Sequence, residues 1–525
     1  MEPSCVRQTS IPGTSKLFSD FLYHFDRVET YFPWHFGNFE HLVQSAKTIN
    51  FPEEKRSGIV RALRAQNPAS PALDQLERPG TVAVVTGQQV GLLSGPSYTV
   101  FKALTAVRLA AQLSEQGTPA VPIFWLATED HDLAEVDHAW LFDAGGTPVK
   151  ISAEGGSVAN SPVGNVEITQ FDLGEIARTL GGLPFGSQVL ERIEQHYRQG
   201  TTFGRAFHGL IRDILSDFDL IYLDPLAPEI RHLCAPFLKE IVQRVDELVP
   251  ALRQRSSELE KAGYHAQVHL DNNASLLFSL EGGKRLALKY NDGRFVSRDR
   301  SFDASELSAQ AEKLSPNALL RPVMQDYLLP TVSYVGGPAE IAYMAQSEVL
   351  YKRLLGRMPV IYPRNSFTML DTRAAKLLDR YGLHVVDLLD SQDRVKSVIA
   401  SKLVPQDLRA EVAALRSGIT KSLSGMRERL LHFDPTLSAA ADKSLAKIGY
   451  QLDKLTAKTA RETMRRDQRA EADAEYLSNL IYPQRHLQER FYSILPFLAK
   501  HGLDLPRNIY EETQLSCPDH MLRTF

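Results

Sequence analysis

The sequence is poor in cysteine, has little net charge and contains no long apolar run. Its 525 residues include three cysteines, Cys5, Cys234 and Cys517, which are far apart and have no metal-ligand spacing. This usage suits a reducing compartment and argues against a framework of disulfides. The net charge of -4 at pH 7 creates no global field that would hold a polyanion, so nucleic acid is not an expected partner. We expect small-molecule substrates instead.

Membrane and export signals are also missing from the sequence. No apolar run approaches the roughly 20 residues that a membrane-spanning helix needs. The opening residues, MEPSCVRQTSIPG, lack the apolar core of a secretory signal peptide. We therefore expect a cytoplasmic protein with no membrane partner. At 525 residues, of which 43% are hydrophobic, the chain can bury a large core divided between two or three domains.

One stretch, residues 82–138, organises the rest of the chain. An apolar, β-branched run is followed by Gly87, Gly91 and Gly95 and then by a helical pattern. A second apolar run, 121–127, ends in the sequence Glu-Asp-His-Asp. This order is typical of a β-turn-α-β unit in a parallel α/β sheet. Both loops would then emerge at the carboxyl edge of the strands, where such sheets bind ligands.

Further strands of the same sheet are predicted downstream. LIYLDP (220–225) is typical of a buried strand, and PTVSYV (330–335) leads into Gly-Gly-Pro and a helical run. PVIYP (359–363) supplies another strand, and the sheet is expected to close with residues 373–381 and LHVVDLL (383–389). The predicted fold class is therefore α/β with a parallel sheet.

Two segments depart from the parallel pattern. Residues 145–319 form an expected insertion of mixed α/β character, with an antiparallel meander whose Gly-Gly and Asp-Gly turns favour two-residue hairpins. Residues 393–481 carry apolar residues stepping by four and three, which predicts a long antiparallel coiled-coil hairpin with arms of about 40 residues or about 60 Å. Its exposed apolar seam favours a two-fold partner, although a hairpin folded only upon itself is the alternative. The expected core is 1–144 with 320–392, and residues 482–525 are expected to return to it.

The glycine-rich turn after the first strand is a candidate anion site. Unpaired N–H groups and the positive end of the helix dipole favour a phosphate or carboxylate near Gly95 and Ser97. The stretch from Gly87 matches neither the Walker pattern nor the dinucleotide fingerprint. Gln88 and Gln89 carry amides able to bind a sugar or an amino acid. The alternative is a bend that lets helix and sheet approach closely, and Lys102 on the following helix is expected on a solvated face.

Glu129, Asp130, His131 and Asp132 directly follow the second strand. Like charges so close raise at least one carboxylate pKa, and a carboxylate beside His131 favours the imidazolium, so the group could supply a general acid and base. A divalent metal held with His138 is disfavoured, because neighbouring loop residues rarely converge on one ion. We expect no bound metal at this loop, and the remaining alternative is a polar loop with a capping aspartate.

The second glycine turn comprises Gly336 and Gly337, followed by Glu340. Glu340 is expected either to bind a sugar hydroxyl or to cap its own helix. Arg364 and Asn365 directly follow the next strand, and Arg364 could fork onto a carboxylate or phosphate or form a surface salt bridge.

With these residues laid out, the chain resembles the bacillithiol biosynthesis cysteine-adding enzymes, the cysteine ligases. The matching segments, in order, are TGQQVGLLSGPSYTVFKALTAVRLA, FWLATEDHDLAEVDH, SYVGGPAEIAYMAQ and PVIYPRNSFTMLD, and a long coiled-coil segment follows. The resemblance implies a Rossmann-like, nucleotidyltransferase-like core with two connective insertions and a homodimer formed through the coiled coil. It also implies the last step of bacillithiol biosynthesis, in which the carboxylate of cysteine is joined to the amine of glucosaminyl malate.

What the resemblance implies for the site can be written residue by residue. Malate is a dicarboxylate, so Arg364 and the helix starts at Gly95 and Gly337 become expected anchors, with His131 or an adjacent carboxylate as the base. ATP or ADP with Mg²⁺ is the implied cofactor. However, class I synthetases carry a His-x-Gly-His signature where this chain reads Gly-Gln-Gln-Val-Gly, which leaves open whether ATP activates cysteine through an adenylate.

Two alternatives to the ligase remain. One is nucleotidyl or glycosyl transfer to another small acceptor by the same fold. The other is a non-catalytic, nucleotide-sensing coiled-coil dimer, in which the two glycine turns and the acidic loop would not converge on one pocket.

Overall fold

A five-stranded parallel sheet forms the centre of the fold in the computed structural model, which describes residues 4–156, 159–298 and 300–525. Its strand order is β14-β13-β2-β3-β7, and every neighbouring pair is parallel. The strands are β2 (Val82–Gln89), β3 (Ala120–Ala127), β7 (Ile221–Leu223), β13 (Thr331–Gly336) and β14 (Val360–Pro363). Nearly every residue of β2 and β3 is buried, as expected for a sheet covered on both faces. The predicted parallel α/β core is confirmed.

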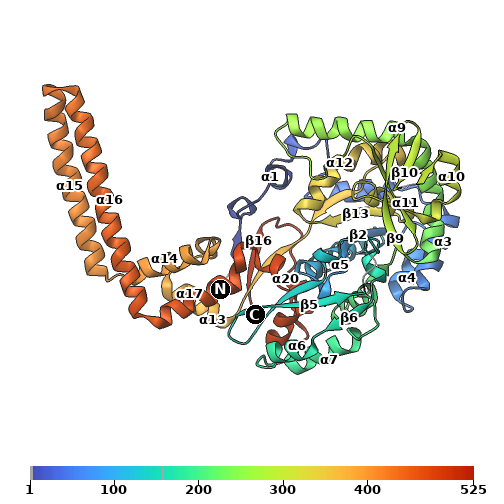
Figure 1. Ribbon diagram of the computed structural model, residues 1–525, viewed down its shortest axis with the longest axis horizontal. Helices are drawn as coiled ribbons and strands as arrows, with labels where there is room; N and C mark the ends of the chain where they lie inside the picture. Colours follow the sequence, from blue (N-terminus) through green and yellow to red (C-terminus); the bar gives the residue numbers. More distant parts are fainter. Residues whose placement is uncertain (1–3, 157–158, 299) are drawn as a thin grey trace. The chain divides into compact units, whose positions relative to one another are not determined.

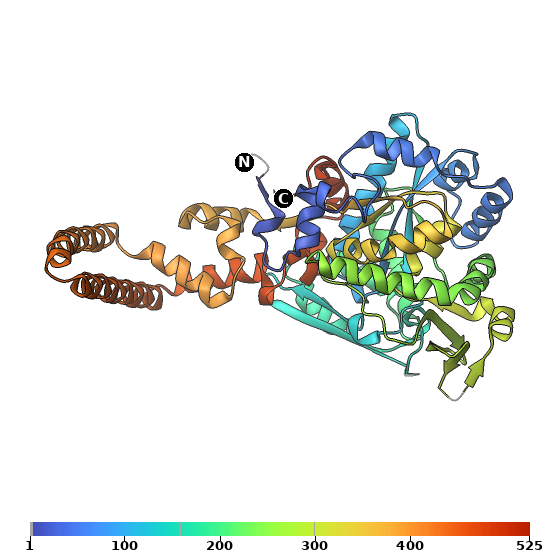
Figure 2. The ribbon, with the colours of Figure 1, turned by 90° about the horizontal axis from the view of Figure 1, so that it is seen from above.

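Helices cover this sheet. Helix α5 (Tyr98–Glu115) follows β2, and α12 (Pro338–Leu354) follows β13. The long helix α9 (Pro228–Lys261) runs beside α12 (Figure 2). The remaining helices near the sheet are α1 (Lys16–Tyr23), α2 (Phe39–Lys47), α3 (Glu53–Arg64), α4 (Pro71–Glu77) and α11 (Arg321–Leu328).

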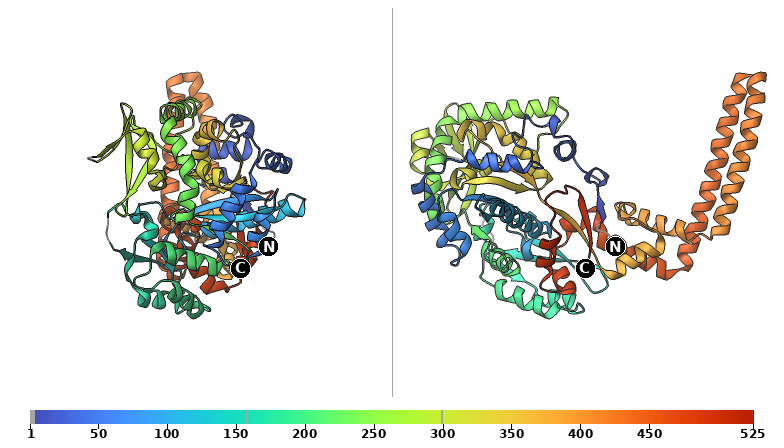
Figure 3. Two further views of the ribbon diagram at one scale, coloured as in Figure 1. Left: turned by 90° about the vertical axis from the view of Figure 1, so that its right-hand side faces the viewer. Right: turned by 180° about the vertical axis from the view of Figure 1, so that it is seen from behind.

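Two small antiparallel sheets are formed by the expected insertion, residues 145–319, together with the strand that directly precedes it. One has the order β4-β5-β6 and comprises β4 (His138–Phe142), β5 (Pro148–Gly155) and β6 (Ile168–Phe171). The other contains the predicted meander and comprises β8 (Ala274–Glu281), β9 (Lys284–Asn291), β10 (Arg294–Ser297), β11 (Arg300–Phe302) and β12 (Leu314–Pro316). Figure 3 shows the meander as a separate yellow-green layer. Both predicted turns adopt positive φ, at Gly282 and Gly283 and at Asp292 and Gly293. Helices α6 (Leu173–Leu180), α7 (Gly186–His196), α8 (Phe203–Ile214) and α10 (Ala304–Ala309) complete this region.

The chain divides into two compact units, and the boundary differs from the one the sequence suggested. The first unit comprises Met1–Ala144, Pro148–Phe367 and Glu489–Leu522, and the second comprises Gly145–Thr147, Thr368–Gln488 and Arg523–Phe525. The expectation that LHVVDLL closes the sheet is wrong. Residues Val385–Leu388 form a 3-10 turn, reached through Gly382, whose φ of 57° ends the preceding helix.

The second unit is helical. Its helices are α13 (Thr372–Tyr381), α14 (Gln392–Leu403), α15 (Gln406–Phe433), α16 (Pro435–Arg466) and α17 (Gln468–Ile481). Helices α15 and α16 run side by side as an antiparallel hairpin (Figure 1), and Arg427 pairs with Asp442 across it at 3.1 Å. Asp434 ends α15 and caps α16 by accepting from the N–H of Thr436. The arms have 28 and 32 residues, which is shorter than expected and corresponds to about 42 and 48 Å.

The C-terminal segment contributes to the first unit. Its elements are α18 (Gln488–Phe491), α19 (Leu495–His501), α20 (Leu505–Glu512) and β16 (His520–Thr524). Strand β16 pairs antiparallel with β1 (Ser4–Val6), with Cys5 opposite Met521, and β15 spans Ser366–Leu370. Within the described ranges, no helix combines the length and the apolarity that crossing a membrane would require.

Candidate functional site

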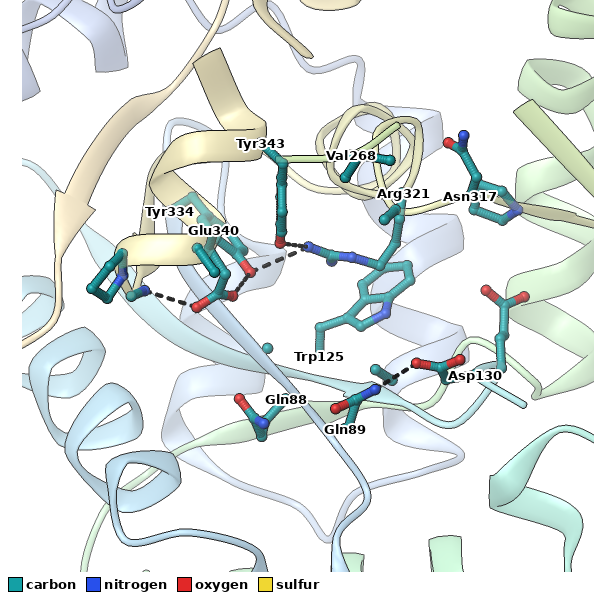
Figure 4. Close-up of a pocket in the computed structure, with 18 of the residues that line it drawn as sticks. Gln88, Gln89, Trp125, Asp130, Val268, Asn317, Arg321, Tyr334, Glu340 and Tyr343 are labelled. Carbon is teal, nitrogen blue, oxygen red and sulfur yellow. Dashed lines mark hydrogen bonds between the residues drawn. The ribbon is translucent and has the colours of Figure 1, made fainter. Parts of the chain in front are cut away.

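A cavity of about 600 Å³ opens at the carboxyl edge of the parallel sheet (Figure 4). Three segments that the sequence singled out contribute to its wall. They are Gly87 to Gln89 at the end of β2, Glu129 and Asp130 after β3, and Gly337 to Glu340 at the start of α12. They meet because β2 lies between β3 and β13 and all three strands run in the same direction. The two glycine turns and the acidic loop therefore share one pocket, although not every residue predicted from them faces it.

Gly87 is required by packing as well as by its place at the cavity. It lies opposite Trp125 in the neighbouring strand, and a Cβ at this position would lie 3.1 Å from the Trp125 carbonyl oxygen and 3.2 Å from its Cβ. The sequence left open a close approach between helix and sheet in this turn. At Gly87 the close approach is between the two strands β2 and β3. The indole of Trp125 itself lines the cavity.

The two glutamines at the end of β2 are held by their neighbours. The Gln88 amide donates to the Tyr98 hydroxyl at 3.2 Å. The Gln89 amide donates to Asp130 at 2.7 Å and to Glu135 at 2.8 Å. Both side chains line the cavity, and Gln89 thereby fixes the orientation of the Asp130 carboxylate.

The expected anion site at Gly95 and Ser97 is not supported by the structure. Ser97 is fully buried, and both its N–H and its hydroxyl donate to the carbonyl of Tyr492 at 2.7 Å. This carbonyl from the C-terminal segment takes the place that an anion would need. Gly95, with φ of 65°, faces a smaller adjoining cavity of about 190 Å³.

Lys102 is buried, which corrects the expectation of a solvated side chain. Its ammonium donates to the Gly87 carbonyl, to the Gln88 side-chain oxygen at 3.2 Å and to Glu340 at 2.8 Å. Only 1% of the residue is exposed. The sequence signal for this burial is the run of apolar and small residues around Lys102 in FKALTA. A lysine buried at the base of the cavity thus connects the two glycine turns.

Glu340 caps its own helix, which is one of the two roles expected from the sequence, and it also lines the cavity. Its carboxylate accepts from the Gly337 N–H at 2.8 Å and from the Tyr334 hydroxyl at 2.6 Å. Burial opposes ionisation, but Lys102 and these donors outweigh it and lower the pKa of Glu340. Gly336 is not among the described residues that line the cavity.

Arg364 lines the cavity, but Glu489 already occupies its guanidinium. The two side chains form a bidentate ion pair with distances of 3.0 and 2.6 Å, and both are buried. The expectation that Arg364 forks onto a substrate carboxylate is therefore not supported, and the surface salt bridge is replaced by a buried one. Asn365 is buried away from the cavity, with its amide donating to the carbonyl of Gln514 at 3.0 Å.

Arg321 is a cavity residue that the sequence analysis missed. It begins α11, and its guanidinium donates to the hydroxyls of Tyr334 and Tyr343, both at 3.2 Å. Figure 4 shows this guanidinium near Trp125, where the ring centroid lies 5.9 Å away. No pattern marks Arg321 in the sequence, because its role depends on strands and helices brought together from elsewhere.

Positive charge exceeds negative charge at the wall of the cavity. Four arginines, Arg285, Arg321, Arg364 and Arg490, and three carboxylates, Glu129, Asp130 and Glu340, line it. Among the residues that the structure describes, Arg321 and Arg490 form no ion pair with a carboxylate. The cavity is therefore suited to an anionic ligand.

Glu129 and Asp130 differ in their surroundings. Glu129 is buried and paired with Arg231. Burial raises the pKa of Glu129, although Arg231 opposes the shift, so the main cause is desolvation and not the like charges that the sequence suggested. Asp130 is half-buried, lines the cavity, and lies 3.8 Å from Arg285. Asp130 is thus the carboxylate of this loop with access to a ligand.

His131 is held as a neutral imidazole, which corrects the expected imidazolium. Its Nδ1 lies 3.0 Å from Nη1 of Arg285 and accepts from this guanidinium. Burial and the positive charge of Arg285 lower the pKa of His131 and outweigh Asp130 and Asp132. Neither His131 nor the exposed Asp132 is among the described residues that line the cavity. His131 instead packs against Phe278, and its Nδ1 lies 3.7 Å from the Asp130 carboxylate.

Comparison with known proteins supports a single family. The N-terminal Rossmann-like domain model of the bacillithiol biosynthesis protein BshC matches residues 1–365, and its C-terminal coiled-coil domain model matches residues 367–524. The chain belongs to the bacillithiol biosynthesis BshC family, and its fold is a Rossmann-like domain followed by a coiled-coil domain.

Several relatives align over most of the chain and carry the name "Putative cysteine ligase BshC". The protein of Solibacter usitatus is 52% identical, with 99% of each chain covered. That of Koribacter versatilis is 35% identical, again with 99% of each covered. The protein of Salinibacter ruber is 31% identical over 82% of this chain and 80% of its own.

Proposed function

We propose that this protein is a cysteine ligase that joins the carboxylate of cysteine to the amine of glucosaminyl malate, the last step of bacillithiol biosynthesis. The observation that carries the proposal is the cavity at the carboxyl edge of the sheet, where Arg321 and Arg490 are available beside the fixed carboxylate of Asp130. The names of the relatives support the same reaction type.

The arginines suit the malate part of the acceptor. Malate carries two carboxylates, and guanidinium groups bind carboxylates through paired hydrogen bonds. Arg321 is braced by two tyrosine hydroxyls and by Gln325 at 3.0 Å, so little side-chain freedom is lost when it binds. Arg490 is more exposed, and its guanidinium lies 5.9 Å from the centre of the Tyr98 ring, which Arg364 approaches to 5.0 Å. We assign malate binding to Arg321 and Arg490.

Asp130 is the best-placed group to receive the proton of the reacting amine. It lines the cavity, whereas His131 is not among the described residues that do so, and a general base must come within hydrogen-bond reach of its proton. Gln89 and the His131 N–H, which donate to Asp130 at 2.7 Å each, orient the carboxylate. We assign orientation of Asp130 to Gln89 and His131.

Amide formation from a free carboxylate requires activation, and ATP with Mg²⁺ would supply it by turning the carboxylate into an acyl group with a leaving group. The start of α12, where Ala339 lines the cavity, suits such an anion and is separate from the two arginines assigned to malate. A cytoplasmic location follows from the proposed reaction, since ATP and cysteine are cytoplasmic metabolites.

We also propose that the protein is a homodimer formed through the hairpin of α15 and α16. No residue of α15 is buried. Large apolar side chains of the hairpin are exposed, namely Leu408, Leu415, Met426, Leu431, Phe433, Leu437, Ile448, Tyr450 and Leu455. A second copy would cover such a surface.

The test of the ligase is direct. Purified protein is incubated with cysteine, glucosaminyl malate and ATP–Mg²⁺, and mass spectrometry is used to detect the thiol product. The proposal expects product that depends on all three substrates. Product formed without ATP would remove only the activation step, whereas folded protein that forms no product would remove the ligase. The non-catalytic alternative predicts that the two glycine turns and the acidic loop lie apart. Gly87, Asp130 and Gly337 line one cavity, which favours the ligase over this alternative.

A further inference from the structure

Two of the three cysteines meet although 512 positions separate them in the sequence. The sulfur atoms of Cys5 and Cys517 lie 3.8 Å apart. Cys5 is exposed and Cys517 is half-buried, whereas Cys234 is fully buried. The contact lies within the first unit of the chain.

The backbone on both sides of this contact is anchored. Cys5 belongs to β1, which pairs with β16 through Val6 and His520. The loop that carries Cys517 is held by the Tyr362 hydroxyl, which donates to the Leu515 carbonyl, and by the Tyr23 hydroxyl, which donates to Asp519. The two sulfur atoms are therefore held near each other by the surrounding fold.

We propose that Cys5 and Cys517 form a reversible intrachain disulfide, with a low-molecular-weight disulfide as the oxidant. A disulfide needs about 2.05 Å between sulfur atoms, so closing the 3.8 Å contact requires roughly 0.9 Å of movement by each sulfur. Side-chain rotation supplies such a movement without a change in the β1–β16 pairing.

The chemistry balances in two exchange steps. The thiolate of one cysteine attacks the small disulfide, forms a mixed disulfide and releases one small thiol. The thiolate of the second cysteine then attacks the protein sulfur of the mixed disulfide, which forms the Cys5–Cys517 bond and releases the second small thiol. Two protein thiols lose two electrons and two protons, and the small disulfide gains both.

The proposed function gives this pair a natural oxidant, and the identity of that oxidant rests on the proposed function. A ligase that joins cysteine to an amine makes a small thiol, and the disulfide of that thiol accumulates under oxidation. In a reducing compartment, protein disulfides of this kind are typically transient and redox-sensing. The pair would thus respond to the oxidation state of the enzyme's own product.

The disulfide would also fix a segment that supports the cavity wall. His520 is three positions beyond Cys517, and its Nδ1 lies 2.6 Å from the Ser366 hydroxyl. The same hydroxyl donates to Glu489 at 2.9 Å, and Glu489 holds Arg364 at the cavity. Oxidation should therefore stiffen residues 513–522.

The experiment uses the full chain and glutathione disulfide as the probe. After oxidation, alkylation and trypsin digestion, the three cysteines fall on separate peptides, 1–7, 232–239 and 508–523. We expect a cross-linked species of 1–7 with 508–523, a mass loss of about 2 Da for the chain, and a fall from three to one in the thiols that can be alkylated once the chain is denatured. Dithiothreitol should reverse all three changes.

Matched serine variants make the result decisive. C5S and C517S should each lose the cross-link, and C234S should keep it, because burial raises the pKa of the Cys234 thiol to about 12 and leaves it unreactive. Hydrogen exchange of residues 513–522 should slow on oxidation in the parent chain and not in C5S. Mixed disulfides with glutathione alone, a cross-link between two chains or one through Cys234 would each overturn the proposal. None of these readouts requires ligase activity, so failure here is separable from failure of the proposed function.

Discussion

The ammonium of Lys102 lies 2.8 Å from the carboxylate of Glu340, and this ion pair connects α5 to the start of α12 beneath the cavity. Lys102 also donates to the Gly87 carbonyl. One ammonium group therefore contacts the end of β2 and the first turn of α12, the helix that follows β13. The pair is more than a local contact, because it holds together the two glycine turns from which the cavity is built.

Replacement of Lys102 should destabilise the fold strongly. In Lys102→Met the carboxylate of Glu340 stays buried without its cation, which should cost about 3–5 kcal/mol in the free energy of unfolding. Urea unfolding followed by tryptophan fluorescence measures this cost. The double variant Lys102→Met/Glu340→Gln should lose less than the sum of the two single variants. Additive losses would show that the two side chains do not depend on each other.

Arg321→Lys should weaken acceptor binding while leaving the fold intact. A lysine keeps the charge but loses the planar fork that two tyrosines orient, so we expect KM for glucosaminyl malate to rise by about 10-fold or more. Arg507→Lys provides the matched control, because Arg507 is exposed and pairs with Asp217. Equal KM values for Arg321→Lys and the control would remove Arg321 from the malate site.

The stability of the protein should fall as the pH drops below neutrality. Burial lowers the pKa of His208 to about 4 and that of His520 to about 4, whereas both titrate near 6.5 when unfolded. Below pH 6.5 the unfolded chain binds more protons than the folded one, so stability is lost progressively toward pH 4. Each histidine should contribute about 2 kcal/mol to the loss between pH 7 and pH 5.

His208→Phe tests this assignment with one residue. The variant should reduce the loss of unfolding free energy between pH 7 and pH 5 by about 2 kcal/mol, which is the contribution of one histidine. A His208→Phe curve parallel to that of the parent would contradict the lowered pKa.

The hairpin seam should control the oligomeric state. Leu415 and Met426 are each 53% exposed in a single chain, so Leu415→Gln/Met426→Gln should halve the mass seen by sedimentation and leave the thermal unfolding of the first unit unchanged. Val386→Gln alters a similarly exposed apolar residue outside the hairpin and should have no effect on mass. A parent chain that sediments as a monomer would remove the proposed homodimer.

The convergence of Gly87, Asp130 and Gly337 could be predicted from the sequence, because apolar runs followed by glycine or acidic residues mark the carboxyl ends of parallel strands. The contacts that decide what each residue does could not. The Arg364 guanidinium is taken by Glu489, 125 positions away, and Ser97 by the carbonyl of Tyr492. Such pairings depend on tertiary packing, and a single sequence carries no period or spacing that reveals them.

Arg321, Lys102 and the neutral state of His131 were missed for the same reason. Lys102 lies in an apolar stretch that could have indicated burial, and Arg285, which sets the state of His131, lies on the buried face of an alternating strand. Neither burial signal indicates which residue Lys102 or Arg285 contacts. The adjacent carboxylates suggested a charged imidazole, but burial of the ring and then a guanidinium from a distant strand outweigh them and lower the pKa of His131.

The ion pair of Arg364 with Glu489 has a consequence for biosynthesis on the ribosome. One wall of the cavity is complete only when residues 489–522 pack onto a sheet whose strands were all made by residue 363. The whole helical hairpin is translated in between. For more than a hundred codons, the nascent chain therefore contains Arg364 without Glu489, its partner in the folded protein. The enzyme should therefore become competent only after that late segment has been translated and has packed onto the sheet.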